Sequence, residues 1–150
     1  MTTNHTTFTI DRTYAATPAR VFQAWANPAF KAKWFNGPDE WASAPHTLDF
    51  RVGGRESLAG GPKGGQVHRY DALYFDIVPN QRIVHAYDMH IGDNRISVSL
   101  ATVELAPAGS GTRLVYTEQA VFLDGFDDAG SRERGTRDLF DKLEAALKSQ

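Results

Sequence analysis

The chain has 150 residues, of which 41% are hydrophobic and 23% charged, a composition typical of one globular domain rather than of a disordered chain. Its formal net charge of −2 argues against a broad basic surface that would bind nucleic acid. The absence of cysteine excludes thiol catalysis, disulfides, Cys-ligated zinc and iron–sulfur clusters.

The N-terminal part predicts one strand and two short helices. Polar and apolar residues alternate over Thr6–Tyr14, which indicates a strand with one buried face. Thr17-Pro18 is a helix start, because threonine caps free N–H groups and proline fits the first helical position. Asn27-Pro28 ends that helix and starts a second, shorter one.

The middle of the chain predicts an antiparallel meander, because successive strands are separated by short turns. The predicted strands are Leu48–Val52, Val67–Val78, Arg82–His90, Arg95–Leu105 and Thr112–Phe122. Val67–Val78 is long and must bend or bulge, and we expect Phe75 on a buried face. The glycine-rich run Gly60–Gly65 is expected to be a flexible loop, and it lacks the pattern of a phosphate-binding loop.

A long C-terminal helix is predicted after Asp127 or Asp128, either of which can cap it. Its apolar stripe consists of Leu139, Phe140, Leu143, Ala146 and Leu147. Traced backwards, the stripe reaches Gly135 and then Ser131 or Arg132, which are small or polar. A cavity beneath the first half of the helix would explain this change. The aromatic residues (3 Trp, 5 Tyr and 9 Phe) exceed what we assign to the core, so we expect some of them to line that cavity.

These elements indicate an α+β fold in which a curved antiparallel sheet wraps around one long C-terminal helix. We expect a single domain over residues 1–150, with an ordered core at about 6–147. No apolar run approaches the roughly 20 residues of a membrane span, and the first residues lack a signal-peptide core. We therefore expect a cytoplasmic protein. A homodimer through an exposed sheet face or edge stays open.

Several motifs, in this order along the chain, resemble one superfamily. They are Ala16–Trp25, Lys33–Phe35, Asp49–Arg55, Asp76–Val84, Gly111–Leu114 and Thr117–Gln119. From about Thr6 to Leu147 the chain is similar to the START-like (SRPBCC) superfamily with the helix-grip fold. Within it, the chain resembles the AHSA-type branch, homologues of the activator of heat-shock-protein-90 ATPase, also described as polyketide cyclase-like. Such folds host many unrelated ligands.

The resemblance implies which strand face points inward, toward the long helix. On that face, side chains near the ligand end would be His85, Tyr87, Met89, Ser97, Ser99, Tyr116 and Glu118, opposite Arg132 and Gly135 of the helix. Glu118 is a candidate general acid or base, and the alternative is a salt bridge to Arg132 or Arg55. His85 is either a partner in that chemistry or a satisfied structural residue.

Three functions stay open at this level. The first is a protein that binds a small apolar molecule or lipid between sheet and helix, with Tyr87, Met89, Ser97, Ser99, Tyr116, Arg132 and Gly135 as contacts. The second is a cyclase- or hydratase-type enzyme that uses Glu118 and His85. The third is an interaction domain of the chaperone-activator kind. We expect no cofactor and no metal site, because the histidines are scattered.

Overall fold

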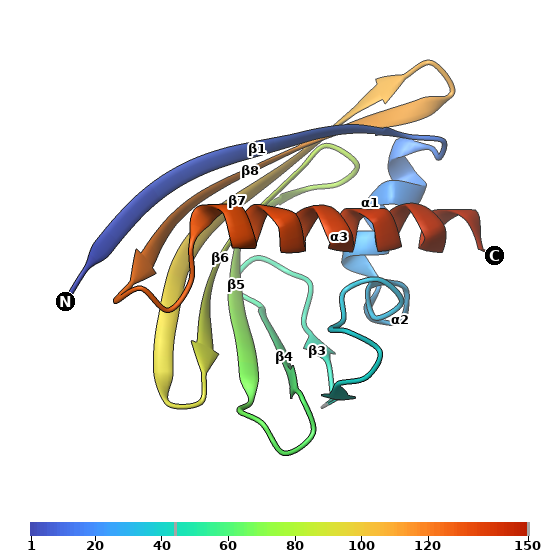
Figure 1. Cartoon of the computed structure of the whole chain (residues 1–150). Helices are drawn as coiled ribbons and strands as arrows, with labels where there is room; N and C mark the ends of the chain where they lie inside the picture. Colours follow the sequence, from blue (N-terminus) through green and yellow to red (C-terminus); the bar gives the residue numbers. More distant parts are fainter. Residues whose placement is uncertain (44, 150) are drawn as a thin grey trace.

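A curved antiparallel sheet grips a long C-terminal helix, α3, in the computed structural model, which describes residues 1–43 and 45–149 (Figure 1). The elements are β1 (Thr3–Tyr14), α1 (Pro18–Ala26), α2 (Pro28–Lys31), β2 (Ala42–Ser43), β3 (Thr47–Leu48), β4 (Arg55–Gly61), β5 (His68–Val78), β6 (Arg82–Ile91), β7 (Asn94–Ala108), β8 (Gly111–Leu123) and α3 (Ala129–Lys148). The predicted α+β architecture, with two short helices after the first strand, is confirmed.

Strands β4 to β8 form a meander, and β1 pairs with β8 as the edge strand of the sheet. Its order is β1-β8-β7-β6-β5-β4-β2, and β3 pairs with β4 beside this path. All pairings are antiparallel, and from β4 to β8 the short turns between successive strands require this. The turn after β5 holds Asn80 at φ 65°, and the turn after β6 holds Gly92 at φ 59°, a left-handed conformation that suits these two residue types. β1 starts at Thr3, opposite Leu123 and earlier than expected.

The bulge predicted for β5 is present, and it changes where Phe75 lies. The register against β6 shifts between Tyr74 and Asp76, so that Phe75 has no paired residue on β6. A bulge of this kind lets one side chain leave the alternation of the strand. Phe75 is 55% exposed as a result, and the expectation that it is buried was wrong.

The segment from Leu48 to Gly61 differs most from expectation. Only Thr47–Leu48 pairs as β3, and the chain then turns, with Gly53 at φ 83°. The next strand, β4, was not predicted, and it includes Gly60 and Gly61, which we assigned to a loop. A Cβ on Gly61 would lie 2.4 Å from the backbone oxygen of Gln66, so only glycine fits this close approach.

The helices are capped as their sequences predict. Thr17 accepts a hydrogen bond from the backbone N–H of Arg20, and Asn27 caps α2 by accepting one from Phe30. For α3, Asp128 rather than Asp127 is the cap, and it accepts from the backbone N–H of Ser131.

Apolar residues in the second half of α3 close the core against the sheet and α1. Phe140, Leu143, Ala146 and Leu147 are buried there. The ring centroids of Trp25 and Trp34 lie 4.8 Å apart, and those of Trp25 and Phe140 lie 5.9 Å apart. The first half of α3 presents a different surface to the sheet.

Candidate functional site

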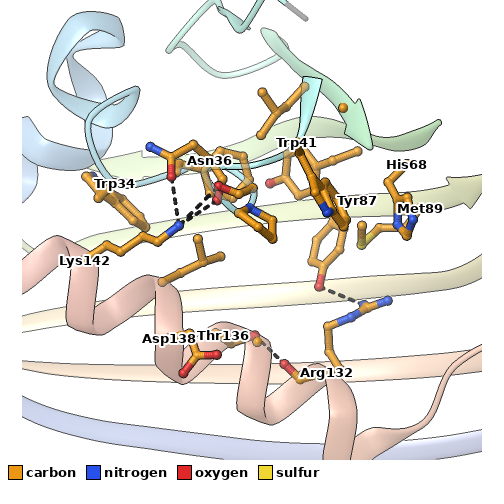
Figure 2. A pocket seen from close by; sticks show the side chains of 18 of the residues that line it. Trp34, Asn36, Trp41, His68, Tyr87, Met89, Arg132, Thr136, Asp138 and Lys142 are labelled. Atoms are coloured by element: carbon orange, nitrogen blue, oxygen red, sulfur yellow. Dashed lines mark hydrogen bonds between the residues drawn. The ribbon is translucent and has the colours of Figure 1, made fainter. Parts of the chain in front are cut away.

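A pocket of about 1090 Å³ lies between the inner face of the sheet, the first half of α3 and the segment that follows α2 (Figure 2). Aromatic side chains supply much of its wall, among them Trp25, Trp34, Phe35, Tyr70, Tyr87 and Tyr116. A well-packed core leaves few voids larger than a water molecule, so a space of this size is a separate feature of the fold.

Gly135 lies on the α3 wall of the pocket. A Cβ added at this position would meet no heavy atom within 4 Å. The side chains at Arg132 and Thr136 are buried on either side of it. The helix therefore leaves open space where its apolar stripe, continued backwards, would otherwise have placed a bulky group.

The structure divides the predicted site residues into two groups. His85, Tyr87, Met89, Tyr116, Arg132 and Gly135 all line the pocket. Ser97, Ser99 and Glu118 are buried but lie outside its lining. The two-residue period of the strands predicts all of these strand residues on one face. The side chain of Arg132, which comes from α3, lies between Ser97 and Glu118 and the pocket.

Glu118 is fully buried and receives several hydrogen bonds. The Tyr87 hydroxyl donates to Glu118 Oε2 over 2.6 Å, and the Ser99 hydroxyl donates to the same oxygen over 2.7 Å. The Tyr116 hydroxyl donates to Oε1 over 2.7 Å. Arg132 Nη1 lies 3.4 Å from Oε2, which is the salt bridge proposed from the sequence as the alternative to catalysis. These donors satisfy both oxygens of the Glu118 side chain, which lies away from the pocket.

Arg132 connects this cluster to the helix. Its Nη1 donates to the Tyr87 hydroxyl over 3.0 Å, and its Nη2 donates to Ser97 over 2.7 Å and to Asp127 over 3.1 Å. Burial opposes the charged form, but Tyr87, Glu118 and Asp127 raise the pKa of Arg132 above its ordinary value. The guanidinium therefore stays charged, and it fixes the first half of α3 to β6 and β7.

A second buried polar cluster lies at the other end of the pocket and was missed from the sequence. Lys31 Nζ donates to Glu56 Oε1 over 2.7 Å and to the Tyr74 hydroxyl over 3.1 Å. The Tyr74 hydroxyl donates to Glu56 over 2.7 Å, and His46 Nε2 lies 2.7 Å from the other carboxylate oxygen. Lys31 lines the pocket, and its ammonium lies 4.6 Å from the ring centroid of Phe35.

The pair of Lys31 and Glu56 is ionic although both groups are almost fully buried. Burial alone would raise the pKa of Glu56, but Lys31, His46 and Tyr74 lower it to about 2. Burial lowers the pKa of Lys31, and Glu56 opposes that shift. The only signal in the sequence is weak: Lys31 stands three residues before the buried Trp34, so both point to the same side of a helical turn.

His85 lies on the pocket wall between these two clusters. Its ring centroid is 5.3 Å from that of Tyr74 and 6.3 Å from that of Tyr87. Burial, with a further effect of Lys31, lowers the pKa of His85 to about 3. The imidazole is therefore neutral at physiological pH, and it is suited to hydrogen bonding rather than to carrying charge.

The rim of the pocket is formed by aromatic rings and one polar contact. The rings of Trp41 and His68 are tilted against each other with centroids 4.6 Å apart, and Phe126, which is 47% exposed, also lines the pocket. From α3, Lys142 Nζ donates to Asn36 Oδ1 over 2.9 Å and to the Asn36 backbone oxygen over 3.3 Å (Figure 2). This contact ties the segment after α2 to the helix across the pocket.

The described residues show neither a metal-binding cluster nor a helix that could span a membrane. No group of three or more His, Asp or Glu side chains in residues 1–43 and 45–149 is placed to hold a metal ion. Within the same residues, no helix is both long enough and apolar enough to span a bilayer.

Comparison with known proteins gives relatives along almost the whole chain. A family model described as "Activator of Hsp90 ATPase homolog 1-like protein" matches residues 15–148. The solved structure of an uncharacterised protein from Rhizobium leguminosarum is 46% identical, with a TM-score of 0.94, over 99% of this chain and 98% of that one. A protein from Rhizobium loti is 49% identical, with a TM-score of 0.90, over 97% and 99% of the two chains.

A more distant solved structure, from Chromobacterium violaceum, is 25% identical with a TM-score of 0.80, over 96% of this chain and 98% of that one. Among curated proteins no match was found. None of the three structure descriptions names a ligand or an activity.

Proposed function

This chain belongs to the Activator of Hsp90 ATPase homolog 1-like family of the START-like (SRPBCC) superfamily, and we propose that it binds a small apolar molecule in the pocket between sheet and α3. The observation that carries the proposal is the pocket itself. Its volume of about 1090 Å³ is slightly above the roughly 300–1,000 Å³ of usual small-molecule sites, so a small molecule has room in it. Its wall is mainly apolar and rich in aromatic rings, and several of its polar side chains, such as Lys31, Arg132 and Lys142, are held by internal hydrogen bonds.

The fixed polar groups favour a binding site over a site of chemistry at Glu118. Tyr87 and Arg132 both reach the wall, and each is already held by the Glu118 cluster. Glu118 itself accepts three short hydrogen bonds and lies behind the wall. A general acid or base has to reach the proton it transfers, directly or through one water, so these surroundings give no support to acid–base catalysis by this residue.

Two experiments test the proposal. Native mass spectrometry of freshly purified protein should show a co-purified small molecule. Titration calorimetry with 2-acetylnaphthalene, a compact apolar probe, should show saturable binding at one site. A replacement that fills the pocket, Gly135→Phe, should weaken this binding by about tenfold or more, because the added ring would occupy the open space.

The matched control is Glu144→Phe, which places the same ring on an exposed position of α3 outside the pocket. We expect the control to bind the probe as the unchanged protein does. The proposal is wrong if no small molecule co-purifies and the probe does not bind. It is also wrong if both replacements leave probe affinity unchanged, because binding would then occur elsewhere.

A further inference from the structure

β1, dark blue in Figure 1, forms one edge of the sheet. It pairs with β8 from Thr3 to Tyr14 without a register shift, and within the described residues no strand pairs with its other side. A long unpaired edge is a template for a further strand, and proteins often protect such an edge by a short strand, a bulge, proline or lysine. β1 is 12 residues long and has none of these four features.

The opposite edge of the sheet is protected. There β2 and β3, of two residues each, cover the two ends of β4. Strands this short present few free backbone groups to another chain. Of the two edges, β1 is therefore the one suited to accept a further strand.

The register shows which backbone groups of β1 point to the open side. The backbone N–H of Asp124 donates to the backbone oxygen of Thr2 over 2.9 Å, and bonded pairs recur at every second residue of an antiparallel ladder. Even-numbered residues of β1 therefore bond β8, and odd-numbered residues direct N–H and C=O outward. Within the described residues no hydrogen bond involves these outward groups. They belong to Thr3, His5, Thr7, Thr9, Asp11 and Thr13.

We propose that β1 pairs with β1 of a second copy of this chain, antiparallel and about a twofold axis at Phe8. The outward backbone groups of the two copies then bond each other, and the two sheets become one continuous sheet. The same surface of both copies meets at such an axis, so the contact is closed and forms a dimer rather than a filament.

The side chains of β1 favour this arrangement. It places Thr7 opposite Thr9 of the second copy, and threonine pairs stabilise neighbouring strands. It also places His5 opposite Asp11, where an imidazole N–H can donate to the carboxylate. Asp11 pairs with a neighbour on β8 but keeps 48% of its side chain exposed. A parallel, in-register pairing would instead set the two Asp11 carboxylates side by side, which is destabilising.

Both α3 and the pocket leave this edge accessible. α3 contacts β1 near its C-terminal end, where Arg12 donates to Asp141 over 2.6 Å and the Tyr14 hydroxyl donates to the backbone oxygen of Phe140 over 3.2 Å. These two residues of β1 are even-numbered, so their side chains lie on the inner face of the sheet. No residue of β1 lines the pocket. The inference therefore goes beyond the proposed function and does not depend on it.

Sedimentation velocity at about 1 to 300 µM tests the pairing. At the upper end of this range we expect a particle of twice the 16.6 kDa of one chain. Replacement Thr7→Pro removes an outward N–H but no bond to β8, so it should give a folded monomer, with folding checked by circular dichroism. The matched control Thr7→Val keeps both the N–H and the shape of the side chain, and it should still form the dimer.

Amide hydrogen exchange followed by NMR gives a second readout that needs no variant. Raising the protein concentration should slow exchange at His5, Thr7 and Thr9 by about tenfold or more, because their N–H groups become bonded only in the dimer. The amides of Thr6 and Phe8 should be protected at every concentration, because they bond β8 in the monomer as well. This alternation distinguishes strand pairing from contact through any other surface.

Three results would overturn the proposal. The first is a monomer over the whole concentration range. The second is a dimer in which the odd-numbered amides of β1 still exchange fast, because the copies would then meet elsewhere. The third is a single copy whose odd-numbered amides are protected by a co-purified peptide, because the edge would then serve a different chain. If the dimer forms but 2-acetylnaphthalene does not bind, only the proposed function is lost.

Discussion

Acidification from pH 7.5 to 5.0 should destabilise the folded protein through His85. The pKa of this buried imidazole is about 3, against 6.5 for the unperturbed residue, mainly because burial disfavours its charged form. Between these two values the unfolded chain binds a proton that the folded chain does not, so the free energy of unfolding falls as the pH falls. At pH 5.0 the loss amounts to about 2 kcal/mol, and at pH 7.5 it is close to zero.

Urea denaturation at the two pH values measures this loss, with the variant His85→Gln as the comparison. The variant cannot take up the proton, so it should lose about 2 kcal/mol less stability than the unchanged protein on acidification. Any cost of the replacement that does not depend on pH cancels in this difference. His68→Gln is a second comparison: burial also lowers the pKa of His68, but that residue is only partly buried, so the effect should be smaller. Equal losses in the unchanged protein and in His85→Gln would refute the reasoning.

Three further predictions concern stability and the pocket rim. Replacement Glu56→Gln leaves the Lys31 ammonium buried without a counter-charge, so it should lower the free energy of unfolding, measured by urea denaturation, by about 3 kcal/mol. The double variant Lys31→Met/Glu56→Leu should recover much of this loss. A loss below about 1 kcal/mol in the single variant would contradict an ionic pair. Replacement Lys142→Met should speed amide hydrogen exchange around Asn36 and lower the free energy of unfolding by only about 1 kcal/mol. Unchanged exchange would show that the contact between Lys142 and Asn36 does not stabilise the rim. Gly111→Ala should cost about 2 kcal/mol or more, because its Cβ would lie 2.3 Å from a backbone oxygen of β1, and normal stability would mean that this edge of the sheet adjusts freely.

The sequence predicts the fold well where a local pattern determines structure. The alternation from Arg82 to Phe122 marks three neighbouring strands, and the pairs Thr17-Pro18 and Asn27-Pro28 mark both short helices, because capping and proline geometry act within a few residues. β4 lacks such a pattern, since it contains a buried glutamate and ends in glycines that close backbone contacts require. The outward turn of Phe75 depends on pairing with β6, which no single strand encodes.

The candidate site was predictable to the level of the sheet face but not beyond it. Strand periodicity places Tyr87, Ser99 and Glu118 on the inner face, yet only the first of these lines the pocket. Whether a residue of this face lines the pocket depends on where the Arg132 side chain lies across the sheet. The ion pair of Lys31 and Glu56 joins residues 25 positions apart, and no helical or strand period relates them. Burial of such a charged pair is determined by the assembled fold, so the sequence around either residue does not predict it.

The placement of the tryptophans has a practical consequence for spectroscopy. The chain contains 3 tryptophans, and Trp25, Trp34 and Trp41 all line the same pocket, two of them in its interior and one at its rim. The tryptophan fluorescence of this protein therefore comes entirely from residues that line one cavity. A ligand that expels water should shift the emission to shorter wavelength without any label. The same signal would report ligand exchange in real time during stopped-flow mixing.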